Sequence, residues 1–108
     1  MGSKSQRKGR QAELELSRIL NDNGLPVKAG NPLNFGSMPD IVGLDGIHIE
    51  VKRHEHLNLS SAMNQAIEDA DKFKDGVPAL FHRRNRSPWL VTMLLDDWME
   101  LYKKGQHG

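Results

Sequence analysis

Hydrophobic and polar positions alternate with two different periods along this chain, and each period predicts one kind of element. Apolar residues that recur every three or four positions predict helices, and strict two-residue alternation predicts strands. In chain order, the pattern predicts a helix at 11–21, strands at 27–29, 40–44 and 47–52, a helix from Ser60 or Ser61 to Phe73, strands at 77–82 and 89–93, and a helix that begins at Asp96 or Asp97. This succession of elements is typical of an α/β protein.

Each predicted helix carries an apolar face that is suited to packing. The first has the stripe Ala12, Leu16, Ile19 and Leu20, the second has Ala62, Ala66, Ala70 and Phe73, and the third has Leu94, Leu95, Trp98, Leu101 and Tyr102. The second face consists mainly of small residues, which allows close packing on a sheet or on a partner helix. Asn23-Gly24 is expected to end the first helix, since glycine commonly follows a helix.

A hairpin is predicted where Asp45-Gly46 separates two apolar runs. It brings Asp40, at the start of the first run, back alongside Glu50 and Lys52 near the end of the second. Alternation places Glu50 and Lys52 on the same strand face as His48, whereas the isoleucines and Val51 point to the other face. The sequence therefore gathers two carboxylates and one lysine at one end of a hairpin.

Two acids and a lysine in this arrangement are what a metal-dependent phosphodiester hydrolase needs. The acids are oxygen ligands for a hard divalent cation, which polarises the phosphate and activates a water. The lysine can stabilise the developing negative charge or position that water. The alternative is an ordinary solvated polar face with a weak surface ion pair.

Pro39-Asp40 and then Glu50-Val51-Lys52 resemble the signature of the PD-(D/E)XK nucleases. The similarity extends from about Gln6 to Tyr102. The basic start and the helix that carries Glu13 resemble archaeal-type Holliday junction resolvases and their phage relatives, and residues 81–92 resemble a stretch of phage-encoded resolvase-like endonucleases. This resemblance implies a restriction-endonuclease-like core, with a small mixed sheet flanked by helices. It also implies magnesium, replaceable by manganese, held by Asp40, Glu50 and the Val51 carbonyl. Glu13, which spacing alone treats as an ordinary helix glutamate, would join this site.

Composition fits a single nuclease domain over residues 1–108, with the basic arm 1–8 and the tail 104–108 expected to be flexible. Hydrophobic residues make up 37% of the chain and charged residues 27%. No apolar run approaches the length of a membrane span, and the start is polar and basic. The absence of cysteine excludes disulfides and thiolate zinc sites. We expect a cytoplasmic protein of a bacterial or phage-infected cell.

The net charge is only +1, but the basic residues form clusters that suit a phosphate backbone. The expected DNA-binding residues are Arg7, Lys8, Arg10, Ser37, Arg53, His54, Arg83, Arg84 and Arg86. Each cluster has the alternative interpretation of a solubilising surface, and Ser37 that of a turn residue. Gln65 is either a site residue, as the resemblance implies, or a solvated helix residue.

These features predict a magnesium-dependent endonuclease that makes paired nicks in branched DNA, most of all in four-way junctions. Paired incision favours a symmetric homodimer with two sites. One alternative is another endonuclease on the same core, such as a flap, nicking or restriction-like enzyme. The other is a non-catalytic DNA-binding module that retains the fold.

Overall fold

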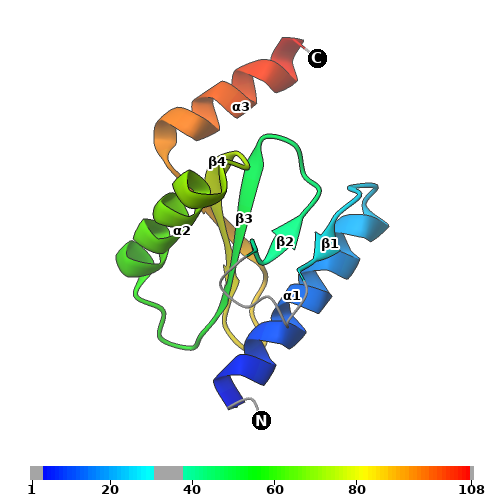
Figure 1. Ribbon diagram of the computed structural model, residues 1–108, viewed down its shortest axis with the longest axis vertical. Helices are drawn as coiled ribbons and strands as arrows, with labels where there is room; N and C mark the ends of the chain where they lie inside the picture. The colour runs from blue at the N-terminus through cyan, green and yellow to red at the C-terminus, as the bar shows by residue number, and fades with distance from the viewer. Residues whose placement is uncertain (1–3, 31–37, 108) are drawn as a thin grey trace.

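A computed structural model describes residues 4–30 and 38–107 of the chain. Its elements in chain order are α1 (Lys4–Asp22), β1 (Lys28–Ala29), β2 (Ile41–Val42), β3 (Ile47–Arg53), α2 (Leu59–Phe73), β4 (Val77–Arg83), β5 (Leu90–Met93) and α3 (Leu95–His107) (Figure 1). This is the predicted succession of a helix, three strands, a helix, two strands and a helix. Among the described residues, no helix is long and apolar enough to span a membrane.

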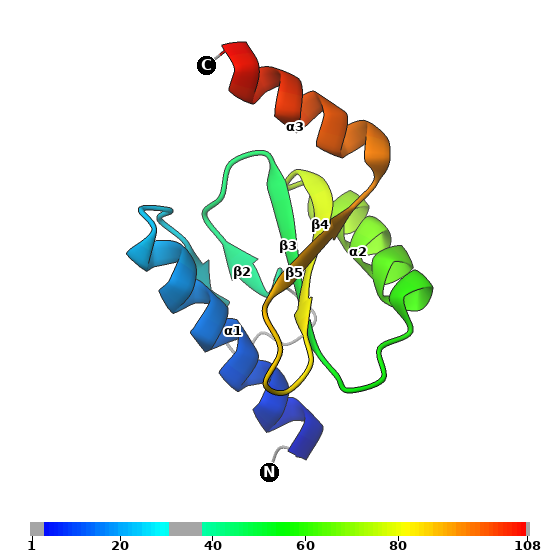
Figure 2. The same cartoon turned by 180° about the vertical axis from the view of Figure 1, so that it is seen from behind.

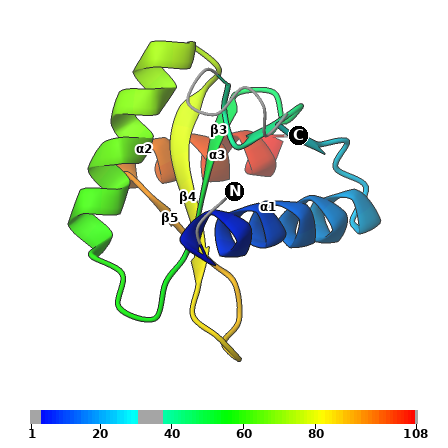
Figure 3. The ribbon, with the colours of Figure 1, turned by 60° about the horizontal axis from the view of Figure 1, so that its bottom comes forward.

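The five strands form one mixed sheet in the order β1-β2-β3-β4-β5. β3 and β4 run parallel, and every other neighbouring pair is antiparallel. Parallel neighbours need a crossover connection, which α2 supplies. α1 covers one face of the sheet and α2 covers the other (Figure 3). The central strand β3 therefore lies between two helices.

Both faces of β3 are buried, so the side chains that alternate along this strand enter two different packed layers. Toward α1, Ile49 and Val51 join a core with Leu16 and Ile41. Toward α2, the fully buried Leu80 of β4 packs in a cluster with Ala62 and Met63. The predicted small face of α2 is confirmed, because its three alanines are buried. Small side chains let this helix approach the sheet closely. The polar residues His48 and Glu50, on the face of β3 toward α2, therefore lie buried beneath the helix.

The buried face of α1 differs from the predicted stripe. Ala12 and Leu16 are buried, but Ile19 is 40% exposed, whereas Ser17 is buried. The helix is thus rotated so that its inner face includes Ser17 and turns Glu13 toward the sheet. Spacing alone could not fix this rotation, because Ile19 and Ser17 flank the same stripe on opposite sides.

The boundaries of four elements differ from the predictions. Residues 4–8, predicted as a flexible arm, form the start of α1, and residues 104–107 of the predicted tail continue α3. α2 begins at Leu59, because the Asn58 side chain caps it by accepting a hydrogen bond from the Ser61 amide at 3.0 Å. β2 covers only Ile41–Val42, and it is followed by Gly43, whose φ of 110° favours glycine.

Candidate active site

The predicted hairpin forms and brings Asp40 to Glu50. Ile41 pairs with Ile49 in the antiparallel register, so Asp40 lies opposite Glu50. The Asp40 Oδ2 atom accepts a hydrogen bond from the Val51 amide at 2.9 Å. The N–H and C=O of one strand residue point toward the same neighbouring strand, so the Val51 carbonyl also faces the Asp40 side. Two carboxylates and a backbone carbonyl thus converge where β2 begins.

Glu50 is a buried carboxyl group, only 3% exposed, under α2. Burial raises its pKa from 4.5 to about 7, although the hydrogen bond from His48 works in the opposite direction. The neighbouring carboxylates of Asp40 and Asp69 raise this pKa further, and Lys52 lowers it. Burial is likewise the main cause of the raised pKa of Asp40. Burial, more than the neighbouring carboxylates, thus makes the charged forms of both acids costly.

The structure brings Glu13 to the same site from α1. Burial and the Asp40 carboxylate raise the pKa of Glu13 to about 7, against the opposing effect of Arg10. The Arg10 guanidinium lies 3.5 Å from Glu13 Oε1 and also donates a hydrogen bond to the Gly30 carbonyl. Arg10, predicted as a DNA contact, thus has partners within the protein that fix the approach of α1 to the site.

A buried histidine supports Glu50, and the sequence analysis did not identify it as a site residue. His48 Nε2 lies 3.1 Å from Glu50 Oε1, and His48 Nδ1 lies 2.9 Å and 3.0 Å from the two carboxylate oxygens of Asp75. The ring also stacks on Phe73 of α2, with centroids 6.2 Å apart. This chain of contacts fixes the position of the Glu50 carboxyl group. The one available signal was the alternation that puts His48 and Glu50 on one face.

Asp69 of α2 is a second residue that the sequence analysis missed. Ligand atoms of His48, Glu50 and Asp69 lie within 4.8 Å of one another, which makes this trio a possible metal-binding group among the described residues. Asp69 directly precedes the buried Ala70, and this position on α2 is only partly exposed. The carboxyl-rich centre therefore extends from the hairpin to the helix that covers it.

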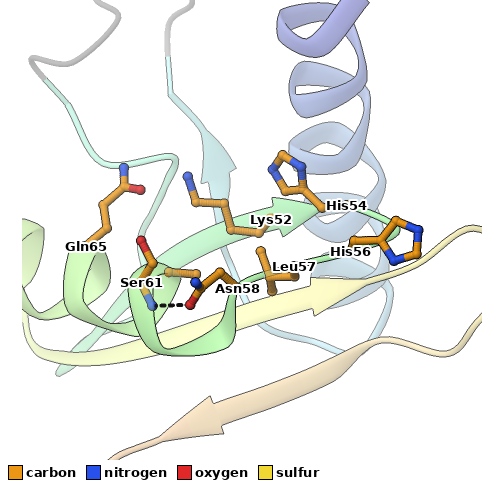
Figure 4. Close-up of a pocket in the computed structure, with 8 residues that line it drawn as sticks. Lys52, His54, His56, Leu57, Asn58, Ser61 and Gln65 are labelled. Atoms are coloured by element: carbon orange, nitrogen blue, oxygen red, sulfur yellow. Dashed lines mark hydrogen bonds between the residues drawn. The ribbon is translucent and has the colours of Figure 1, made fainter.

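Lys52 lies beside the carboxylates and at the edge of a cleft of about 220 Å³. The cleft lies between the end of β3 and the start of α2, and its lining consists of Lys52, His54, His56, Leu57, Asn58, Ser61, Ala62 and Gln65. Figure 4 shows Lys52 and Gln65 extending in the same direction from β3 and α2. The predicted residues Lys52, His54 and Gln65 thus line one solvent-accessible depression next to the acids.

The arginine-rich loop between β4 and β5 is fastened to α1. Glu15 Oε1 accepts hydrogen bonds from the Arg83 guanidinium and from Trp89 Nε1, the latter at 2.8 Å. Arg83 is therefore engaged inside the protein, whereas Arg84 and Arg86 are exposed. The three arginines were predicted as one group, because the proximity of Glu15 to Arg83 cannot be deduced from the sequence.

Arg53 also contacts this loop. Its guanidinium donates to the Asn85 side-chain oxygen at 3.1 Å, and the backbone N–H of Asn85 donates to the Glu55 carboxylate at 2.9 Å. These contacts hold the loop near the end of β3. Lys8 is partly exposed on α1. The predicted contact Ser37 and the side chain of Arg7 lie outside the described residues.

The residues at the centre fit a hard divalent cation. Carboxylate and carbonyl oxygens are the ligands that magnesium prefers, and the raised pKa values of Asp40 and Glu50 show that burial without a cation is costly for their charged forms. A bound cation would stabilise the charged forms of both carboxyl groups and so offset the cost of their burial. The donor set contains no sulfur ligand, because the chain has no cysteine.

The raised pKa of Glu50 predicts how stability depends on pH without metal. Glu50 ionises near 4.5 when unfolded and near 7 when folded, so the folded state retains a proton between these values. The free energy of unfolding therefore falls as the pH rises from about 4.5 to 7, because the folded state must then give up that proton and bury the charge. Glu50→Gln carries no such charge, so in EDTA its Tm should exceed that of the wild type more at about pH 8 than at about pH 5. Thermal denaturation at both values measures this, and a pH-independent difference would contradict it.

Comparison with known proteins supports the architecture. No protein-family model and no curated protein matches the chain. Among solved structures, it is similar to Hjc, a Holliday junction resolvase of the archaeal hyperthermophile Archaeoglobus fulgidus. The TM-score is 0.58 at 24% identity, and the match covers 80% of this chain and 72% of that chain. The predicted α/β fold, a small mixed sheet flanked by helices, is thereby confirmed as the fold of that resolvase.

Proposed function

We propose that the chain is a metal-dependent endonuclease that hydrolyses DNA and resolves Holliday junctions by paired nicks. The observation that carries this proposal is the convergence of Asp40, Glu50 and Lys52 at one end of the β2–β3 hairpin. The shared fold with a junction resolvase supports the choice of substrate. Cleavage of a synthetic four-way junction in magnesium tests it.

Asp40, Glu50 and the Val51 carbonyl would hold the cation, with Glu13 contributing through a water. Magnesium bound there supplies Lewis-acid polarisation of the phosphate and a more acidic water. Manganese accepts the same oxygen ligands and is expected to substitute. Calcium is expected to bind but to support cleavage poorly, because its coordination geometry is less strict. The contact between His48 and Glu50 keeps one ligand in a fixed position before any cation arrives.

Lys52 and the cleft would act on the substrate. The Lys52 ammonium, beside the acids, stabilises negative charge that develops on the phosphate or orients the attacking water. His54 and Gln65 line the same cleft and are placed to contact a phosphate or sugar next to the scissile bond. The exposed Arg84 and Arg86 lie on the loop between β4 and β5, and they would bind the DNA backbone at phosphates farther from the scissile bond.

Replacing Arg84 and Arg86 with alanine is expected to weaken binding to junctions and plain duplexes alike. Each arginine that neutralises a phosphate releases counterions, so the slope of log K against log salt should flatten by up to about 0.9 per lost contact. Fluorescence anisotropy over a salt series measures the slope. Arg83 stays in place, because its contact with Glu15 is structural.

Arg18→Ala is the matched control, since Arg18 is exposed on α1 outside the arginine loop. It removes one arginine charge, against two in the loop variant, and should leave the slope close to that of the wild type. An unchanged slope in the Arg84 and Arg86 variant, with its circular dichroism intact, would remove the loop from the proposed DNA surface.

A four-way junction presents two equivalent strands, so paired incision calls for two sites in a symmetric dimer. The alternative within the same chemistry is a flap, nicking or restriction-like endonuclease, which would prefer another substrate in the same cleavage assay. A non-catalytic DNA-binding module would bind but not cleave. The intact set of Asp40, Glu50 and Lys52 argues against that second alternative.

A further inference from the structure

His48 is a completely buried imidazole, and both of its ring nitrogens face carboxyl groups. Its Nδ1 atom lies 2.9 Å and 3.0 Å from the two carboxylate oxygens of Asp75, and its Nε2 atom lies 3.1 Å from Glu50 Oε1. A neutral imidazole has one N–H donor and one lone pair. When Nδ1 donates its N–H to Asp75, the lone pair of Nε2 is therefore directed at Glu50 Oε1.

This arrangement is typical of a histidine that ligates a metal ion. Such a histidine ligates through one nitrogen and donates its other N–H to a carboxylate, which fixes the ring, and Asp75 provides that carboxylate. Adjacent ligands of one zinc ion lie about 3 to 3.5 Å apart, because each bond is about 2.0–2.2 Å long. The separation of 3.1 Å between Nε2 and Oε1 fits this range. Without a metal ion, a proton joins the two atoms, and a bound cation takes the place of that proton.

Asp69 adds a third ligand from the helix that covers this face of the sheet. α2 lies beside β3 and β4 in the views of both Figure 1 and Figure 2. Ligand atoms of His48, Glu50 and Asp69 all lie within 4.8 Å of one another. Within the part of the chain that the structure describes, no hydrogen bond or ion pair engages the Asp69 carboxylate, and the residue is partly exposed. This carboxylate is therefore available to a cation that enters from the solvent.

The donor atoms of this trio differ from those of the magnesium site proposed above. Asp40, Glu50 and the Val51 carbonyl offer only oxygen, which suits magnesium. The trio adds an imidazole nitrogen, and imidazole suits zinc, copper, iron and nickel. Zinc also binds a given set of nitrogen and oxygen ligands more tightly than manganese does. Glu50 belongs to both sets, so a zinc ion in the trio competes with magnesium for the same carboxylate.

We propose that His48, Glu50 and Asp69 form a zinc-binding site, and that zinc bound there inhibits magnesium-dependent cleavage. The bound ion neutralises the Glu50 carboxylate and repels a second divalent cation beside it. The inhibition rests on the proposed function, because it concerns the same cleavage reaction. The zinc site does not rest on it, since zinc binding is measured without DNA and without magnesium.

Calorimetric titration of the full, metal-free chain with zinc tests the site. One zinc ion per chain should bind, with a micromolar Kd or tighter. Asp75→Asn removes the outer partner of His48 and should weaken binding by about 10- to 100-fold, and Asp69→Asn, which removes a ligand, should weaken it at least as much. Both residues are partly exposed, so circular dichroism should stay unchanged. Asp71→Asn is the matched control, because Asp71 is exposed on the same helix and should not affect the affinity.

Asp40→Asn distinguishes the trio from the magnesium site. Asp40 is not a member of the trio, so this variant should lose magnesium binding but lose much less zinc affinity than Asp69→Asn does. A wild type that binds no zinc overturns the proposal, and so does an Asp69→Asn variant with the affinity of the wild type. Equal losses of zinc affinity in Asp40→Asn and Asp69→Asn also overturn it, since zinc would then occupy the magnesium site.

Cleavage of the four-way junction by the wild type measures the inhibition. At a zinc concentration ten times the Kd measured in the same magnesium buffer, the rate should fall by about tenfold, because about nine tenths of the sites are then filled. An unchanged rate at this concentration would contradict the competition for Glu50. A chain that binds zinc as expected but cleaves no DNA in magnesium would instead count against the proposed function alone.

Discussion

Glu50→Gln is expected to abolish magnesium-dependent cleavage, with a loss of at least about 1000-fold, while the protein still folds and binds DNA. The amide keeps the size of the side chain and can still accept a hydrogen bond from His48, but it loses the charge that a cation needs. Asp40→Asn should have the same effect from the other side of the hairpin. A gel assay of a labelled junction measures cleavage, and anisotropy measures DNA binding, which the lost charge is expected to preserve or tighten.

Asp45→Asn provides the matched control for these variants. Asp45 is an exposed carboxylate in the turn of the same hairpin, so its loss changes the charge equally without touching the convergent acids. Its cleavage rate should stay close to that of the wild type. Normal cleavage by both Glu50→Gln and Asp40→Asn in magnesium would refute the assignment of the site.

Lys52→Ala is expected to slow cleavage by on the order of 100- to 1000-fold, as the loss of one preorganised electrostatic contact does. Lys52 does not ligate the cation, so the variant should still bind manganese in a calorimetric titration. Retained metal binding with lost turnover distinguishes an effect on the reaction from a collapse of the site.

Lys28→Ala is the control for this variant, because Lys28 is an exposed lysine of the edge strand β1. It removes the same charge from the same sheet and should not change turnover. A Lys52→Ala enzyme that turns over at a rate close to the wild type would make Lys52 a surface lysine without a catalytic role.

The hairpin of the candidate site could be predicted because the residues that specify it are close together in the sequence. Asp45-Gly46 specifies the turn, and the alternation of Ile47 to Lys52 specifies the two faces of the strand. The register then follows, and it places Asp40 opposite Glu50 as expected. The convergence of acids and lysine required no knowledge of contacts between distant segments.

The support around these acids could not be predicted, because it depends on contacts between distant segments. Asp75 follows the end of α2 and meets His48 only because α2 crosses back over β3. Asp69 joins the group only through the rotation of the same helix. Arg83 appeared to be one of three equivalent arginines until its contact with Glu15, 68 positions earlier, was known. Charge clusters in a sequence do not reveal which members are already paired.

The most direct test of metal-dependent junction cleavage is a panel of DNA substrates incubated with the wild-type chain, with and without magnesium. The panel contains a four-way junction and linear, nicked and flap duplexes of matched sequence. The expected result is two symmetric nicks in the junction, faster than any cut in the other substrates, and none in EDTA. Failure to cleave any substrate in magnesium or manganese, or equal cleavage in EDTA, would contradict the proposed function.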